Sequence, residues 1–138
     1  MKRIVLISCV SKKRTYPCQA RELYISDWFK KALAYAEKIL KADQIFILSA
    51  EHGVVSLEKI IVPYDKTLKK MPKIERLKWS QQIMDELKQH IDIEQDEVVF
   101  LAGEKYREFL EPQFKQVQTP LEGLKIGQQL KFFKERLQ

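Results

Sequence analysis

Hydroxyl, thiol and basic side chains are concentrated near the amino terminus, in the segment 8–18. Lysine supplies a point charge, and arginine supplies a fork of donors for phosphate oxygens. The segment lacks the glycines of a Walker loop or a dinucleotide fingerprint, which disfavours a nucleoside triphosphate cradle. We expect it to bind a phosphate or similar anion, with a solvated basic loop as the alternative. The residues expected to bind are Ser8, Ser11, Lys12, Lys13 and Arg14.

His52 and Asp65 are the candidates for acid–base chemistry. His52 follows a predicted strand and precedes Gly53, and its imidazole titrates near neutral pH. A structural role in the turn is the alternative. Asp65 offers a carboxylate that could position a water molecule, accept a proton or orient an imidazole, with an Asx-turn as the competing role. His90 is expected at a helix end, where the helix dipole stabilises an imidazolium.

Aromatic and basic side chains accompany these candidates. Tyr64 directly precedes Asp65, and its ring can stack on a base or close the top of the core. Lys105 and Tyr106 follow Gly103 at the end of another predicted strand. They can present a cation for phosphate and a second ring for stacking.

Cys9 permits two interpretations. Cys9, His52 and Asp65 occur in an order that allows a nucleophile, a base and an orienting carboxylate. Cys9 also ends a predicted buried strand, where a thiol is commonly a small core side chain, and we favour that role. Its spacing to Arg14 differs from the Cys-x5-Arg loop of thiol phosphatases. The two Cys and two His lack zinc-site spacing, so we expect no metal and no cofactor.

Alternating apolar runs and amphipathic stretches predict the elements that position these residues. Short aliphatic runs predict strands, and apolar residues at helical spacing predict helices. The strands are expected at 3–7, 44–48, 97–101 and 115–118, and the helices at 26–40, 72–90, 104–110 and 127–137. The stretch 54–70 lacks a clear period and predicts an ordered loop with a short extended piece.

This alternation predicts a single α/β domain over residues 1–138. Its expected architecture is a three-layer α/β/α sandwich with a mainly parallel sheet of about four strands. In such sheets, ligands bind beyond the carboxyl ends of the strands, where the strand order reverses. The rule selects three loops, at 8–18, 49–65 and 102–106.

Composition narrows the classes of function. The chain has 138 residues, of which 45% are hydrophobic, and this is enough apolar material for one core. Its 25 Lys and Arg against 19 Asp and Glu give a net charge of +6, a modest indication of a polyanionic partner. The apolar run 4–7 is too short for a signal peptide or a membrane span. We therefore expect a cytoplasmic protein with reduced cysteines and no membrane partner.

Motifs along almost the whole chain resemble an uncharacterised bacterial and phage domain family. The motifs are Ile7–Cys9 with Ser11–Lys13, Ala20–Tyr24 with Ser26 and Phe29, Leu48–Ala50 with His52–Val54, Pro63–Asp65, Leu101–Gly103 with Tyr106, and Pro120–Leu121 with Gly123 and Ile126–Gly127. More distantly, Cys9–Lys13, Ser49–Val54 and Tyr64–Asp65 are similar to the glycosylase-like domain of archaeosine synthase, which is grouped with the uracil-DNA glycosylase fold.

The second resemblance implies a pocket for a nucleobase or nucleoside, free or within DNA or RNA. The Gly-Gln-Asp-Pro-Tyr water-activating loop of the glycosylases is absent after the first predicted strand. In a glycosylase-like reaction, Asp65 would position water and His52 would polarise the leaving base. The alternative is a non-catalytic nucleic-acid-binding module, in which tyrosines such as Tyr16, Tyr64 and Tyr106 stack on bases. A structural or partner-binding domain is the third possibility.

Overall fold

A computed structural model describes all 138 residues and contains a five-stranded sheet with the order β4-β3-β1-β6-β7. The strands of this sheet are β1 (Arg3–Ser8), β3 (Gln44–Ser49), β4 (Gly53–Ser56), β6 (Glu97–Leu101) and β7 (Gln116–Gln118). β4 is antiparallel to β3, and the other pairs are parallel. Two short strands, β2 (Cys18–Gln19) and β5 (Ile60–Ile61), form a separate antiparallel pair.

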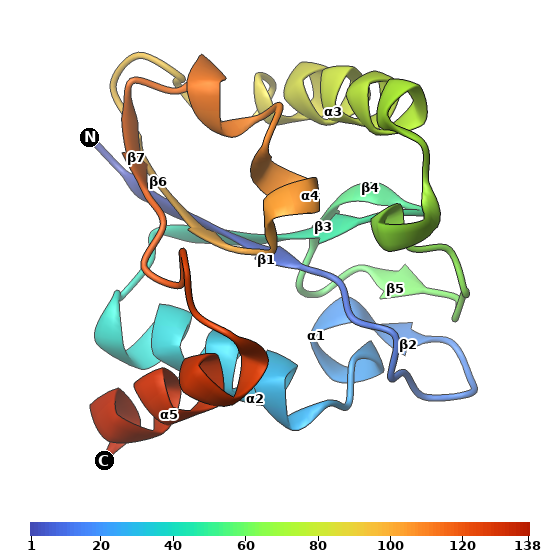
Figure 1. Cartoon of the computed structure of the whole chain (residues 1–138), viewed down its shortest axis with the longest axis vertical. Helices are drawn as coiled ribbons and strands as arrows, with labels where there is room; N and C mark the ends of the chain where they lie inside the picture. The colour runs from blue at the N-terminus through green and yellow to red at the C-terminus, as the bar shows by residue number, and fades with distance from the viewer.

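Helices lie on both sides of the main sheet (Figure 1). α3 (Lys73–Leu87) and α4 (Glu104–Arg107) lie on one side, and α2 (Asp27–Ala34) and α5 (Ile126–Leu137) lie on the other. The remaining helical pieces are α1 (Ala20–Leu23), a π-helical extension of α2 (Tyr35–Ile39) and two 3-10 turns (Leu68–Lys70 and Glu111–Gln113). None of the helices combines the length and apolar character needed to cross a membrane.

β1 is the central strand, and its sequence explains this position. Ile4, Val5, Leu6 and Ile7 are all fully buried, as expected for an aliphatic run that is covered on both faces. β1 pairs with β3 on one side and with β6 on the other, so that Ile4 lies opposite both Gln44 and Val98.

The prediction of an α/β fold with a mainly parallel sheet is confirmed, and the four predicted strands correspond to β1, β3, β6 and β7. Ser26 caps α2 as expected, since its Oγ accepts a hydrogen bond from the Phe29 amide at 3.1 Å. The prediction of a loop over 54–70 is wrong in part, because β4, β5 and a 3-10 turn occupy much of it. The predicted helix at 104–110 ends earlier, at Arg107.

The strand order reverses between β1 and β6. The chain leaves β1 through α2 to reach β3 on one side, whereas it leaves β6 through α4 to reach β7 on the other side. Neighbouring strands whose connections diverge in this way leave a crevice beyond their carboxyl ends. In this chain, the residues that follow β1 and β6 are Cys9 and Ala102, so this rule directs attention to the loops that begin there.

Gly53 makes the sharp turn that places β4 beside β3. Its φ is +76°, and a Cβ added there would lie 2.6 Å from Glu86 Oε2. We expect Gly53→Ala to lower the free energy of unfolding by roughly 1–2 kcal/mol, the cost of a left-handed backbone for a non-glycine residue, because the Glu86 carboxylate ends a flexible side chain and can move aside. Urea denaturation measures this change. Gly123→Ala is the matched control, because Gly123 has a φ of +79° and open space around it; a much larger loss at Gly53 than at Gly123 would contradict this movement of Glu86.

Candidate functional site

Hydroxyl and thiol side chains meet beyond the carboxyl ends of the central strands. We call this group the tyrosine cluster. Its members are Cys9, Tyr24, Ser49, Tyr64 and Tyr106. All are buried except Tyr64, which is half-buried. They come from five separate segments of the chain, so the cluster is assembled by the fold at the edge where parallel-sheet proteins bind ligands.

Tyr64 is the centre of the hydrogen bonds in the cluster. Its hydroxyl accepts a hydrogen bond from Ser49 Oγ at 2.8 Å and is hydrogen-bonded to the Tyr24 hydroxyl at 2.6 Å. Ser49 Oγ in turn accepts hydrogen bonds from the amides of Glu51 and His52, at 3.2 and 2.9 Å. Ser49 therefore joins the turn after β3 to the Tyr64 side chain.

Cys9 faces Tyr106 across the point where the strand order reverses. Cys9 Sγ lies 3.3 Å from Tyr106 Oη, and the Tyr106 ring packs edge-on against Trp79 with the centroids 5.7 Å apart. Cys9 is 6% exposed, so its predicted burial is confirmed. Tyr106 is 5% exposed, which favours a role in the core over stacking on a base.

Burial controls the protonation of the three tyrosines. Loss of contact with water is the main cause that raises the pKa of Tyr24, Tyr64 and Tyr106 above the ordinary value for tyrosine. Their hydroxyls consequently stay protonated at neutral pH. A ligand that reaches the cluster meets neutral groups that can both donate and accept hydrogen bonds.

Lys13 lies over the cluster. A β-bridge between Lys13 and Tyr24 holds the backbone of the first loop against the segment after α1. Lys13 Nζ lies 4.4 Å from the centroid of the Tyr64 ring and 5.8 Å from that of Tyr24. Burial lowers the pKa of Lys13, and the charges of Cys9 and then Asp65 oppose that shift. Lys13 is thus a half-buried cation on an aromatic surface, in contrast to the exposed Lys12.

The other predicted anion-binding residues differ in exposure. Ser11 and Lys12 are exposed on the first loop. Ser8, at the end of β1, is only 6% exposed, so its side chain is buried and is not available to an anion in solvent. Arg14 is exposed but engaged, since its Nε donates to the Glu22 carbonyl at 2.9 Å and its Nη1 to Tyr16 Oη at 3.1 Å.

Lys105 brings further basic residues to the site. Its Nζ donates to the Lys69 carbonyl at 3.2 Å, which joins α4 to the 3-10 turn at Leu68–Lys70. Lys69, which is exposed, is therefore a basic residue beside Lys105 that the sequence had not indicated as a ligand.

His52 lies in the turn between β3 and β4, Asp65 lies between β5 and the 3-10 turn, and no hydrogen bond joins the two side chains. His52 is half-buried, its Nε2 is hydrogen-bonded to the Val62 carbonyl at 3.2 Å, and its ring packs edge-on against Tyr64 at 5.0 Å. Asp65 is exposed, and its charge acts on Lys13. No hydrogen bond joins Cys9 to His52 or Asp65, so the three residues do not form a connected triad.

Sequence reasoning missed Ser49 and Tyr24 as members of the site. Ser49 was named as the start of a loop and within the family resemblances but not as a binding residue, although a polar side chain that directly ends a buried strand indicates a position at the ligand-binding edge of the sheet. Tyr24 lies in a short helical region whose spacing predicts nothing about its partner, because that partner, Tyr64, is 40 residues away.

The Tyr64 hydroxyl provides a test of the cluster. We expect Tyr64→Phe to lower the free energy of unfolding by about 1–3 kcal/mol, because the buried hydroxyls of Ser49 and Tyr24 lose their partner. Thermal or urea denaturation measures the change. Tyr16→Phe is the matched control, since Tyr16 is 52% exposed and water can replace its hydrogen bond. A Tyr64→Phe variant as stable as the control would contradict the cluster.

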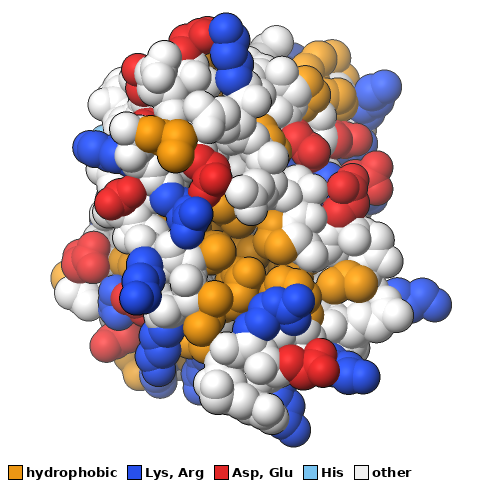
Figure 2. Space-filling view, turned by 90° about the vertical axis from the view of Figure 1, so that its left-hand side faces the viewer, with side chains coloured by type: hydrophobic (Ala, Val, Ile, Leu, Met, Phe, Trp, Pro, Cys, Tyr) orange, Lys and Arg blue, Asp and Glu red, His pale blue; other side chains and the backbone are white.

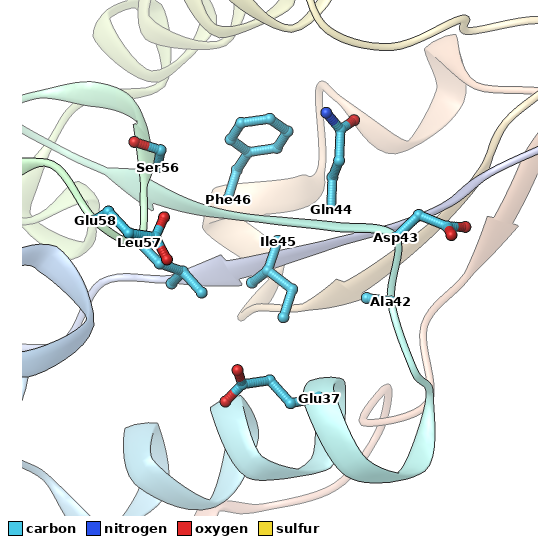
Figure 3. A pocket seen from close by; sticks show the side chains of 9 residues that line it. All are labelled: Glu37, Ala42, Asp43, Gln44, Ile45, Phe46, Ser56, Leu57 and Glu58. Atoms are coloured by element: carbon cyan, nitrogen blue, oxygen red, sulfur yellow. The ribbon is translucent and has the colours of Figure 1, made fainter.

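Two hollows lie elsewhere on the surface. One is a groove beside the amino-terminal half of β3, shown in Figure 3, which is lined by Glu37, Ala42, Asp43, Gln44, Ile45, Phe46, Ser56, Leu57 and Glu58. Its lining has three carboxylates and no lysine or arginine, and although Arg21 pairs with Glu37 and Glu58, the excess of negative charge disfavours phosphate. The other adjoins Met1 and Arg3 near the amino terminus. Figure 2 shows the face of the molecule that lies on the left of Figure 1, where β7 and the amino terminus are, and hydrophobic side chains gather at its middle.

No three His, Cys, Asp or Glu side chains are grouped so that they could hold a metal ion. In comparisons with known proteins, the model of a family of unknown function (DUF6884) matches residues 4–135. No curated protein and no solved structure matches the chain.

Proposed function

Because the chain belongs to the DUF6884 family, whose function is unknown, we propose its function from its own site: it binds a nucleotide or nucleic acid at the carboxyl edge of the sheet. The observation that carries the proposal is the position of Lys13, whose Nζ lies 4.4 Å over the Tyr64 ring where the strand-end loops meet. A cation beside an aromatic ring suits a ligand that carries both phosphate and a planar base.

The exposed basic residues of the edge are proposed to bind phosphate. Ser11, Lys12 and Arg14 come from the first loop, and Lys105 reaches the segment that holds Lys69. These residues approach from two directions, which suits a polynucleotide backbone as well as a single phosphate. The excess of Lys and Arg over Asp and Glu supports the same choice of partner.

The tyrosine cluster is proposed to receive the base. Tyr64 is half-buried and offers part of its ring, while the protonated hydroxyls around it can pair with polar atoms on the edge of a base. Tyr106, which is buried, supports the floor of the site through Cys9 and Trp79.

A glycosylase-like reaction is the finer form of this proposal. Asp65 would position water against the N-glycosidic bond, and His52 would polarise the leaving base. In this form, the helices on the two sides of the sheet are the outer layers of an α/β/α sandwich, as the resemblance to the glycosylase-like domain implies. The proposal places the protein in the cytoplasm, where both free cysteines stay reduced.

A non-catalytic nucleic-acid-binding module is the second candidate. Two observations favour it: His52 Nε2 is already hydrogen-bonded to the Val62 carbonyl, and Asp65 is exposed without a hydrogen bond to His52. Binding then depends on the basic residues and Tyr64 alone, and no bond in the ligand is broken.

Base release separates the two candidates. Chromatography of nucleosides and oligonucleotides incubated with the protein measures the freed base. For a glycosylase, we expect Asp65→Asn and His52→Ala to lower the rate by roughly 10²–10⁴-fold, the usual contribution of general acid–base groups. Glu51→Gln, which alters an exposed carboxylate in the turn before His52, is the control and should retain the wild-type rate.

The outcomes are distinct. Wild-type rates in Asp65→Asn and His52→Ala would remove both residues from the mechanism. Binding without any release of base by the wild-type protein would leave the non-catalytic module. Absence of binding to any nucleotide or oligonucleotide would reject both forms of the proposal.

A further inference from the structure

Lys13 differs from the other basic residues at the carboxyl edge of the sheet. It is half-buried, and the one hydrogen bond of its Nζ is a long one, to the Ser11 carbonyl at 3.4 Å. The lysines that form ion pairs with carboxylates are Lys31 and Lys115, so Lys13 is held without such a partner. Its amine instead lies against the rings of Tyr64 and Tyr24.

Partial burial makes the Lys13 amine easier to deprotonate. Loss of contact with water lowers the pKa of Lys13, while the ring faces of Tyr64 and Tyr24 hold the amine in place. A neutral lysine amine is a nucleophile toward carbonyl carbon, and desolvation is one of the ways in which proteins activate it. Lys12, one residue away, is exposed to solvent.

We propose that Lys13 forms an imine with the aldehyde carbon of a sugar phosphate bound at the tyrosine cluster. Such an aldehyde is the open-chain form of the sugar that remains when a base is removed from a nucleotide. This inference rests on the proposed function, because it takes the ligand to be a nucleotide product or an abasic nucleic acid.

The reaction balances without any oxidant or further reactant. Lys13 Nζ first loses a proton, for which the nearby carboxylate of Asp65 or water is the acceptor. Its lone pair adds to the carbonyl carbon, and the carbonyl oxygen takes up a proton to give a carbinolamine. Loss of water then forms the imine, and hydrolysis reverses each step. The protonated imine keeps the positive charge beside the Tyr64 ring, where the ring face attracts a cation.

Reductive trapping tests this inference. Full-length protein is incubated with ribose 5-phosphate, or with a single-stranded oligonucleotide containing one abasic site, in the presence of sodium cyanoborohydride. Peptide mass spectrometry then locates the reduced adduct. We expect Lys13 to be modified several times faster than Lys12. Equal modification of Lys12 and Lys13 would overturn the proposal, and this comparison needs no variant.

Lys13→Arg is the matched variant, because arginine keeps the charge and forms no imine under these conditions. We expect this variant to lose the trapped oligonucleotide adduct; an adduct of undiminished yield would overturn the proposal. Binding of an intact oligonucleotide, measured without reductant, separates this inference from the proposed function. Binding without trapping rejects the imine alone, whereas trapping of ribose 5-phosphate without oligonucleotide binding supports the imine and rejects the nucleic-acid partner.

Discussion

The double substitution Lys12→Ala, Lys13→Ala is expected to weaken the binding of a single-stranded oligonucleotide by roughly 30-fold. Each lost contact to phosphate is worth about 1 kcal/mol, and a factor of ten in affinity corresponds to about 1.4 kcal/mol. The slope of log affinity against log salt should also decrease in magnitude by about 1.4, since each phosphate contact on a single strand contributes about 0.7 to that slope. Fluorescence anisotropy at several salt concentrations measures both quantities.

The control for this experiment is a second pair of adjacent lysines. Lys30 and Lys31 lie on α2, outside the first loop, and Lys31 pairs with Asp27 at 2.8 Å. The double substitution Lys30→Ala, Lys31→Ala removes the same net charge. An equal loss of affinity in the two double variants would show that binding follows net charge and not the first loop.

Phe29→Ala is expected to lower the free energy of unfolding by about 3–5 kcal/mol, the usual cost of removing a fully buried phenylalanine side chain. Phe29 is 0% exposed, and its ring centroid lies 4.9 Å from that of Tyr24. The substitution would therefore leave a cavity next to Tyr24 in the tyrosine cluster, and we expect oligonucleotide binding to weaken along with stability. Urea denaturation followed by circular dichroism measures the first effect.

Tyr16→Ala is the aromatic control for this substitution. Tyr16 is 52% exposed, so its loss should change stability by about 0.5 kcal/mol or less. A small domain is stable by only about 5–15 kcal/mol, and the Phe29→Ala change is a large part of that. A Phe29→Ala variant within about 1 kcal/mol of the wild type would contradict the packing of α2 under the site.

The central strands were predictable because a strand that is buried on both faces has several consecutive apolar residues. Ile4 to Ile7 form an unbroken aliphatic run, and Val98 to Leu101 form an unbroken apolar run that includes Phe100. β4 was not predictable in the same way. Its status as a strand depends on pairing with β3 after the turn at Gly53, and four residues carry no distinctive period. Likewise, helical spacing over 26–40 cannot show that the last part is π-helical.

The position of the site was predictable to the level of loops. The rule for parallel sheets selected the loops that contain Lys13, Tyr64 and Tyr106, and the structure brings these three residues to the tyrosine cluster. Which residues contact one another in the tyrosine cluster could not be predicted from the sequence. Ser49 lies 15 residues before Tyr64, and the Cys9–Tyr106 contact spans 97 residues, so only the folded chain shows them together.

Binding of a nucleotide at the tyrosine cluster is measured by titrating isotope-labelled protein with a mononucleotide and following its backbone amides by NMR. We expect the shifts to concentrate at Lys12 to Arg14, His52, Tyr64 and Asp65. Shifts confined to the acidic groove between Glu37 and Glu58, or no shifts at all, would contradict it.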